Sequence, residues 1–191
     1  MHRRIDGTVE RLLFRRQYRE DAALRSFARE CAFVMQPEKW LDLTVDQIGL
    51  HAGATWVAVY KEIGEGYVRI RQRGSHALPA QVDVDDLAFV KLRSRGAEVD
   101  LNDTPSALGQ IGYAFPLHVR GNLLGALVVG PRTGEHYVMD ERELFAHVAH
   151  EVGATMFALE AQATETLLND ARAREAALLE LLRSNGATAK P

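Results

Sequence analysis

The chain has only one cysteine, Cys31, in 191 residues. A single cysteine cannot form a disulfide within the chain, and it cannot provide the four thiolates of a structural zinc site. Chains without disulfides are typical of reducing compartments, so the sequence favours the cytoplasm. Cys31 lies among apolar residues at helical spacing, where a small buried thiol is the ordinary expectation.

Long apolar runs are missing too. No segment approaches the roughly 20 consecutive apolar residues that cross a bilayer, and the start of the chain lacks the apolar core of a secretory signal. Any membrane anchor would therefore lie outside this chain. The net charge of −3 also lacks the basic excess of a nucleic-acid-binding domain, so we expect no nucleic-acid partner.

Residues 1–22 depart from this charge balance. They contain six arginines: Arg3, Arg4, Arg11, Arg15, Arg16 and Arg19. A basic helix of this kind is typical of the cytoplasmic side of a membrane anchor, where anionic lipids attract arginine. A solvated helix face in a protein without an anchor has the same pattern.

Recognised catalytic motifs are absent. The sequence has no Gly-x-Ser-x-Gly elbow, no Walker loop and no Gly-x-Gly-x-x-Gly after a predicted strand. His147 and His150 share one predicted helix, but a zinc-protease helix would need histidine at Ala154. With no third ligand nearby, we expect no metal site and no cofactor. The sequence therefore predicts a protein that is not an enzyme.

Apolar residues at helical spacing predict helices at both ends of the chain. One helix is expected within residues 5–34 and a second from Pro37 to Gly53. The last helix is expected to begin at Asp140, with Glu143 completing a capping box. Because residues 161–183 contain neither glycine nor proline, this helix is predicted to run for about 40 residues.

So long a helix leaves leucines in water unless a second helix covers them. The sequence therefore predicts a homodimer with a coiled coil. The residues expected at its interface are Leu24, Phe27, Cys31, Val148, Val152, Leu159 and Leu167.

Two hairpins are predicted in the middle of the chain, one around Gly64–Gly66 and one around Gly121–Asn122. The sheet is therefore mainly antiparallel, because short turns permit no parallel return. Alternation places Tyr67, Arg69 and Arg71 on one face of a strand. In the strand Leu123–Val129, alternation places Leu123, Leu127 and Val129 on one face and Leu124, Ala126 and Val128 on the other. Because both faces are apolar, this strand is predicted to be covered on both sides. A short helix ending at Gly96 and an irregular loop over residues 102–112 lie between the hairpins.

The segments AFPLHVRGNLLGALVVGP and MDERELFAHVAHEVGATMFAL give the order strand, tight glycine turn, strand and acid-capped helix. Together with the preceding elements they resemble a GAF domain, and the resemblance covers residues 23–160. The basic first helix is similar to the helix that follows the membrane region in bacterial membrane-anchored sensor proteins.

The resemblance implies an α+β fold with the terminal helices packed on one face of an antiparallel sheet. Short helices and loops would cover the other face and enclose a small-molecule pocket. The residues expected at this pocket are Trp56, Tyr67, Arg69, Arg71, Phe89, Asp103, Tyr113 and His118. A pocket filled by its own side chains is the alternative.

Three specialised GAF activities lack their residues here. Members that reduce methionine sulfoxide need several cysteines. Members that tether bilin need a cysteine at the pocket, whereas Cys31 precedes the sheet. Members that bind cyclic nucleotides carry Asn-Lys-x-Asp-Glu, of which only Asp140 and Glu141 are present.

The sequence thus predicts four parts: a basic helix (1–22), a GAF-like domain (23–160), a signalling helix (161–184) and a disordered tail (185–191). The expected function is that of a regulatory sensor domain in a bacterial signalling protein. It would relay small-molecule binding through its terminal helices to a fused or partner output domain. The alternative is a ligand-free GAF fold that only pairs chains or serves as a scaffold.

Overall fold

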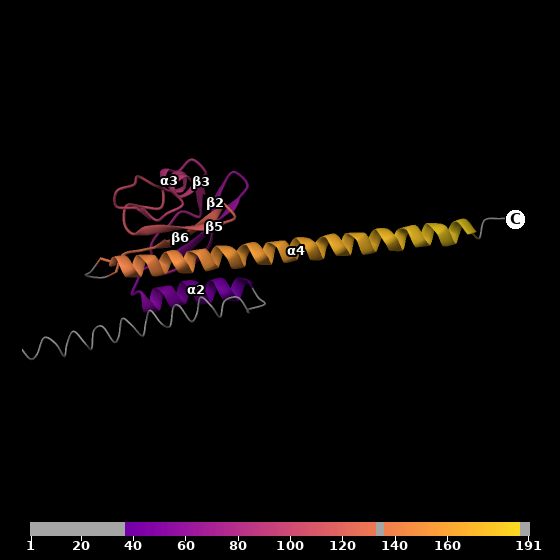
Figure 1. Cartoon of the computed structure of the whole chain (residues 1–191), viewed down its shortest axis with the longest axis horizontal. Coiled ribbons are helices and arrows are strands. Elements are labelled where there is room, and N and C mark those ends of the chain that lie inside the picture. The colour runs from indigo at the N-terminus through magenta and orange to yellow at the C-terminus, as the bar shows by residue number, and fades with distance from the viewer. Residues whose placement is uncertain (1–36, 133–135, 188–191) are drawn as a thin grey trace, which may run out of the picture. The chain divides into compact units, whose positions relative to one another are not determined.

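The computed structural model describes residues 37–132 and 136–187 (Figure 1). Its elements, in chain order, are α2 (Pro37–His51), β1 (Val57–Ile63), β2 (Gly66–Arg73), β3 (Gln81–Asp83), α3 (Leu87–Arg95), β4 (Val99–Asp100), β5 (Tyr113–Val119), β6 (Asn122–Val129) and α4 (Met139–Ala187). The chain divides into two compact units, and the boundary falls between Thr155 and Met156, within α4. The predicted basic segment 1–22 lies outside the described residues.

The strands form one antiparallel sheet in the order β3-β2-β1-β6-β5-β4. Both predicted hairpins are confirmed. Arg120 and Gly121 connect β5 to β6 with φ values of 51° and 85°, as expected for a two-residue hairpin turn with both central residues left-handed. The short strand β3, which the sequence analysis did not predict, pairs with the first residues of β2.

The two central strands are buried on both faces, as predicted. β1 is fully buried from Val57 to Tyr60, and β6 from Ala126 to Val129. α2 and the first turns of α4 cover one face, where Phe145 packs edge-on against Phe115 of β5 with 5.6 Å between ring centroids. α3 and two loops cover the opposite face (Figure 1). We call these the α4 face and the α3 face, and this layering confirms the predicted fold class.

Two β-bulges change which side chains share a face. The first lies between Val59 and Tyr60 and makes Ile70 an extra residue in β2. The second lies where β5 passes from Leu117 to His118 and makes Leu124 an extra residue in β6. Strict alternation therefore fails at both places.

The consequence in β6 is a correction to the predicted faces. Leu123 packs in the α3-face cluster with Ala126 and Val128, not with Leu127. Leu124 is only half-buried. The remaining predicted neighbours, Leu127 and Val129, stay on the α4 face.

The ends of the helices follow local polar chemistry. α3 is capped by Asp86, whose carboxylate accepts a hydrogen bond from the Ala88 backbone N–H at 2.9 Å, and it ends at Gly96 with φ 62°. The end at Gly96 was predicted, and Asp86 is the cap out of the two that the sequence allows, Asp85 and Asp86. α4 begins at Met139 rather than Asp140, and its cap is Glu141 rather than Glu143. The Glu141 carboxylate accepts from the Val138 N–H at 3.0 Å and pairs with Arg132.

α4 contains 49 residues and ends at Ala187. Its length confirms the predicted long final helix, and its end lies within the predicted disordered tail, so the tail does not begin at residue 185. Among the described residues, no helix combines the length and apolar character needed to cross a bilayer.

Candidate functional site

The α3 face holds a cluster of buried side chains that come from the sheet, α3 and two loops. We call it the α3-face cluster. Its members are Trp56, Ala58, Tyr60, Tyr67, Leu78, Val82, Ala88, Phe89, Leu92, Val99, Leu101, Leu108, Ala114, Leu123, Ala126 and Val128. Most of these are aliphatic, and three of the aromatic members, Tyr60, Tyr67 and Phe89, contact one another.

Phe89 of α3 is the centre of the aromatic group. Its ring is stacked on Tyr67 of β2, with 3.7 Å between centroids and planes 8° apart. Tyr60 of β1 meets the same ring edge-on, with centroids 6.2 Å apart. Phe89 therefore fills the space between α3 and the sheet.

Two loops close over this cluster. The loop after β2 contributes Leu78, and its Pro79 carbonyl accepts a hydrogen bond from the Tyr60 hydroxyl at 2.7 Å. The same loop carries His76, whose ring stacks on Trp56 with centroids 5.0 Å apart. The loop before β5 contributes the fully buried Leu108. The cluster is thus shut off by segments without regular structure, which can open at lower cost than a strand or helix.

Asp86 fastens one of these loops to α3. Besides capping α3, its carboxylate accepts from the Ser106 hydroxyl at 2.7 Å and from the Ala107 N–H at 2.8 Å. Lys91 of α3 adds a second attachment by donating to the Thr104 hydroxyl at 2.7 Å. The loop over residues 102–112, which the sequence indicated as irregular, is therefore held closed by side chains of α3.

Polar groups of the cluster lie near its edge. Burial raises the pKa of Tyr60 to about 12, although the nearby Arg69 guanidinium opposes the shift. Arg69 itself donates to the Leu78 carbonyl. Burial also raises the pKa of Tyr67, with a smaller contribution from Glu62 and an opposing one from Arg93. Both phenols therefore remain protonated at neutral pH, and the Tyr60 hydroxyl acts as a hydrogen-bond donor.

The Tyr67 hydroxyl is buried and has no hydrogen-bond partner among the described residues. Arg93 lies close enough to influence its pKa, but the two groups do not reach hydrogen-bonding geometry. Arg93 instead donates to the Val84 carbonyl at 2.7 Å. An unpaired buried hydroxyl costs about 1–3 kcal/mol, so this position favours an added acceptor.

The structure brings together five of the predicted pocket residues. Trp56, Tyr67 and Phe89 are in the cluster, while Arg69 and His118 lie at its borders, and His118 is next to Gly96 at the end of α3. Asp103 is exposed in the loop before β5. The sequence analysis missed Tyr60, His76, Asp86 and Leu108.

Two other predicted pocket residues lie on the α4 face instead. Arg71 pairs across the sheet with Val59 and forms an ion pair with Asp42 of α2 at 2.8 Å. The β-bulge at Ile70, the residue before Arg71, turns the Arg71 side chain to the face opposite to that of Tyr67 and Arg69. Tyr113 pairs with Val129 and packs near Phe115 and Tyr137. Neither residue reaches the α3-face cluster, so these two assignments are corrected.

The predicted dimer residues also divide. Leu24, Phe27 and Cys31 lie outside the described residues. Val148 and Val152 are each only 1% exposed, so they are core residues of their own chain and are not available to a second copy. Leu159 is half-buried, and Leu167 is 70% exposed. Leu167 is thus the predicted contact that a partner helix can reach.

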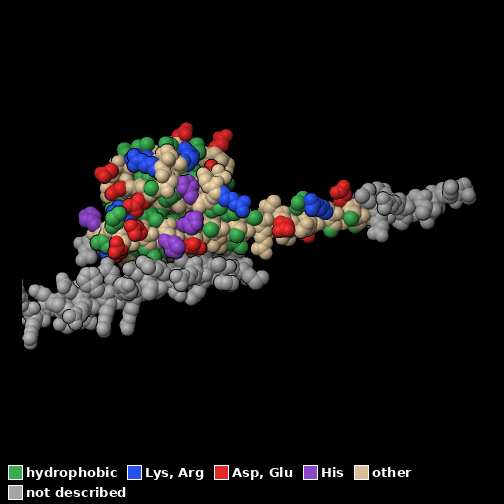
Figure 2. All heavy atoms as spheres, in the orientation of Figure 1, with side chains coloured by type: hydrophobic (Ala, Val, Ile, Leu, Met, Phe, Trp, Pro, Cys, Tyr) green, Lys and Arg blue, Asp and Glu red, His purple; other side chains and the backbone are tan. Residues whose placement is uncertain are grey.

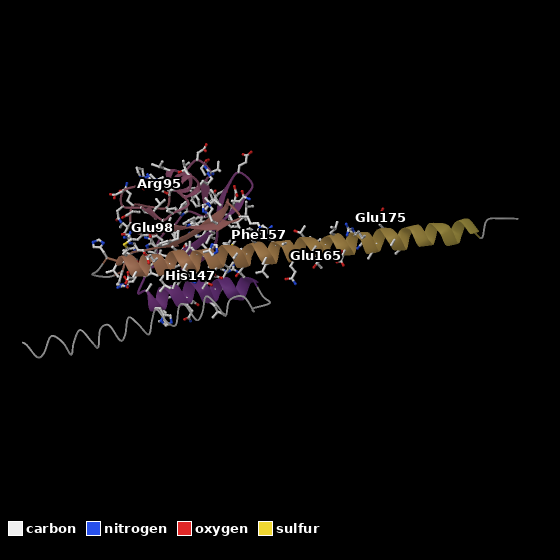
Figure 3. The ribbon with its side chains drawn as sticks, in the orientation of Figure 1. Arg95, Glu98, His147, Phe157, Glu165 and Glu175 are labelled. Carbon is white, nitrogen blue, oxygen red and sulfur yellow. The ribbon has the colours of Figure 1, made fainter. Side chains whose placement is uncertain are left out.

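Histidine side chains are visible on the face shown in Figure 2, and His147 is labelled on α4 in Figure 3. Within the described ranges, however, no group of three or more His, Cys, Asp or Glu residues is arranged to hold a metal ion.

No family model matches the sequence, and no curated protein matches it significantly. Solved structures do match the fold. The GAF domain of a phosphoenolpyruvate-protein phosphotransferase from Coxiella burnetii aligns with a TM-score of 0.64 and 17% identity, covering 78% of this chain and 98% of that one. Residues 122 to 287 of a methyl-accepting chemotaxis protein align with a TM-score of 0.58 and 11% identity, covering 71% of this chain and 98% of that one.

A third similar structure is an enzyme. The free methionine-R-sulfoxide reductase of Neisseria meningitidis, in complex with its substrate, aligns with a TM-score of 0.61 and 17% identity, covering 73% of this chain and 89% of that one. At these identities the likeness shows the fold alone. The chain therefore has the fold of GAF domains, and its function must be argued from its own residues.

Proposed function

We propose that the chain is a regulatory GAF-type sensor domain of a bacterial signalling protein and has no catalytic activity of its own. It binds a small molecule at the α3-face cluster, forms a homodimer and relays binding through its terminal helices. The observation that carries this proposal is the ion pair between Arg142 of α4 and Glu98, the residue before β4, with 2.5 Å between Nη1 and Oε1.

This ion pair connects the two halves of the proposed relay. Glu98 belongs to the short segment that leaves α3, the helix that packs on the cluster, whereas Arg142 belongs to the first turn of α4. A ligand that moves α3 therefore changes a contact of α4. If the ligand binds more tightly to one of two positions of α3, it increases the population of that position. The start of α4 then changes its position together with α3.

Dimerisation is proposed from the composition of α4. Within its second unit, Leu167 and Leu168 are 70% and 49% exposed, and four more leucines follow in the sequence at positions 178, 179, 181 and 182. Charged residues such as Glu165 and Glu175 lie on the same part of α4 (Figure 3). A long helix with exposed leucines on a charged background is stable when a second helix covers the leucines.

The dimer is tested by analytical ultracentrifugation of the full chain and of Leu167→Glu with Leu168→Glu. Gln162→Glu, also on the exposed part of α4, is the control for added charge. We expect dimers for the parent and the control and monomers for the double variant. A monomeric parent chain would refute the dimer.

Ligand binding is tested by native mass spectrometry of freshly purified protein together with thermal-shift screening. A copurified or stabilising small molecule supports sensing. The second candidate function, a ligand-free module that only pairs chains, is favoured by the Tyr67–Phe89 stack, which fills the α3-face cluster with the chain's own rings. Under that function no compound stabilises the protein, while the dimer persists.

A place beside a membrane is proposed from residues 1–22 alone. Their arginines suit the cytoplasmic surface of a bilayer that an anchor outside this chain would cross. The full chain should then cosediment with vesicles containing phosphatidylglycerol at low salt. The double variant Arg15→Gln with Arg16→Gln should bind these vesicles more weakly. Equal binding by parent and variant would contradict the proposed role of these arginines.

A further inference from the structure

The cations of the two sheet faces differ in their partners. On and around the α4 face, four arginines each pair with a carboxylate. These pairs are Arg71 with Asp42 at 2.8 Å, Arg73 with Asp46 at 3.3 Å, Arg142 with Glu98 at 2.5 Å, and Arg132 with Glu141. The charges of this face are thus balanced within the chain.

The cations beside the α3-face cluster contact only neutral oxygens within the part of the chain that the structure describes. Arg69 donates to the Leu78 carbonyl, Arg93 to the Val84 carbonyl and Lys91 to the Thr104 hydroxyl. Asp86 is occupied by its three hydrogen bonds to α3 and the loop. Glu62, opposite Tyr67 in the sheet, is exposed and forms no ion pair with these cations. These three cations are therefore available to an anion.

Tyr67 adds a specific hydrogen-bond donor next to this charge. Its hydroxyl is buried and has no hydrogen-bond partner within residues 37–132 and 136–187, and the Arg93 guanidinium lies nearby. An acceptor that reaches this hydroxyl relieves the cost of burying it unpaired. A carboxylate suits the position because it accepts from a phenol and from a guanidinium at once.

The stacking of Phe89 on Tyr67 indicates the shape of group that fits the α3-face cluster. This stack, at 3.7 Å and 8°, is closer to a face-to-face sandwich than the offset or edge-on pairs that aromatic rings prefer, with centroids about 4.5–7 Å apart. The space against Tyr67 therefore fits a flat ring. A second planar ring can take this place if Phe89 moves with α3.

We propose that the α3-face cluster binds a small planar aromatic carboxylate. Its ring replaces Phe89 against Tyr67, and its carboxylate accepts from the Tyr67 hydroxyl and the Arg93 guanidinium, with Arg69 as the next cation. This inference rests on the proposed function, because it assigns a ligand class to the same site. It also explains the relay, since displacement of Phe89 moves α3 and with it the segment that carries Glu98.

The proposal is tested by titrating the full chain with three probes in calorimetric and thermal-shift measurements. Benzoate has both the ring and the charge, benzamide has the ring without the charge, and cyclohexanecarboxylate has the charge without a planar ring. We expect benzoate to bind at least about tenfold more tightly than either of the others. Benzamide lacks the charge, and a hydrogen bond to a charged group contributes about 1.5–3 kcal/mol. Cyclohexanecarboxylate lacks the flat ring that stacks on Tyr67. Equal binding of benzoate and benzamide, or of benzoate and cyclohexanecarboxylate, or no binding at all, would overturn it.

Variants separate this role from a structural one. Arg93→Gln should weaken benzoate about tenfold or more, whereas Arg95→Gln, on the same turn of α3 and exposed (Figure 3), should not. Tyr67→Phe should weaken benzoate while keeping or raising the melting temperature of the free protein, because it removes an unpaired buried hydroxyl. Loss of stability without loss of affinity would make Tyr67 a packing residue only.

The two proposals fail in different ways. If benzoate binds selectively but leaves hydrogen exchange in α4 unchanged, the ligand class stands and the relay is wrong. If a neutral compound binds at the cluster and changes exchange in α4, the relay stands and the ligand class is wrong.

Discussion

Arg142, in the first turn of α4, pairs with Glu98, which lies three residues after the end of α3. The Arg142 guanidinium also lies over the Tyr113 ring, 5.4 Å from its centroid. A side chain of α4 is thus held both by the segment that leaves α3 and by the first residue of β5. Through this pair, a movement of α3 that displaces Glu98 changes a contact at the start of α4.

Removing the pair should therefore loosen the start of α4 at little cost to overall stability. Both side chains are partly exposed, so a double-mutant cycle of Glu98→Gln and Arg142→Gln should give a coupling of about 1 kcal/mol or less in urea unfolding. Hydrogen exchange at the first turns of α4 should rise in both single variants. Asp42→Asn, which breaks the ion pair between α2 and Arg71, should not raise it. Unchanged exchange in Glu98→Gln would contradict the link.

Asp86 should control the closure of the loop before β5. Asp86→Ala removes a helix cap and two bonds to the loop, and we expect a loss of about 1–2 kcal/mol together with faster hydrogen exchange over residues 102–112. Asp86→Asn retains one acceptor oxygen and should show a smaller effect. The neighbouring exposed Asp85 provides the control, as Asp85→Ala. Equal exchange in the alanine variants would show that Asp86 does not fasten the loop.

Tyr60 predicts a loss of stability at high pH. Burial raises its folded pKa to about 12 from the ordinary value of 10.0, so the folded state keeps the proton while the unfolded chain loses it. Stability from this source is complete below pH 10 and falls as the pH rises from 10 towards 12, by at most about 1.4 kcal/mol for each pH unit. Urea unfolding at several pH values should show a shallower decline in Tyr60→Phe. An identical decline in the two proteins would contradict the shift.

Gly125 should tolerate no side chain. A Cβ there would lie 2.0 Å from the Tyr60 carbonyl oxygen, whereas a Cβ on Gly121 would have nothing within 4 Å. Gly125→Ala must therefore displace β1 from β6, and we expect a loss of about 3 kcal/mol or more in the free energy of unfolding. Gly121→Ala meets only the strain of its positive φ, about 1 kcal/mol. Similar losses in the two variants would contradict this packing.

The hairpins, the caps of α3 and the long final helix were predictable because they depend on local chemistry. Asp86 and Gly96 are the residue types that begin and end helices, and the turn at Gly121 is too short for any other pairing. The two buried faces followed from the run Leu123–Val129 of β6, which contains no charged or polar side chain. Each of these signals lies within a few consecutive residues.

The errors arose where distant segments decide the outcome. A bulge depends on the partner strand, so nothing within β2 alone shows that Arg71 turns towards Asp42 of α2. Val148 and Val152 have the spacing of a helix seam, but the sequence does not show whether a seam faces its own sheet or another chain. His76 and Leu108 lie in loops without periodicity, and only the folded chain brings them to the cluster.

The central claim is that a change in the α3-face cluster changes the arrangement of the two α4 helices in a homodimer. The distance between spin labels on the two α4 helices measures this directly. A label is placed at Glu175→Cys, exposed on α4, in a Cys31→Ser background, and double electron–electron resonance is recorded with and without Phe89→Leu, which removes the ring that fills the cluster. We predict a defined distance between the two labels that shifts in Phe89→Leu and returns towards the parent value when Glu98→Gln is added. Absence of dipolar coupling, or the same distance in all three proteins, would contradict the account.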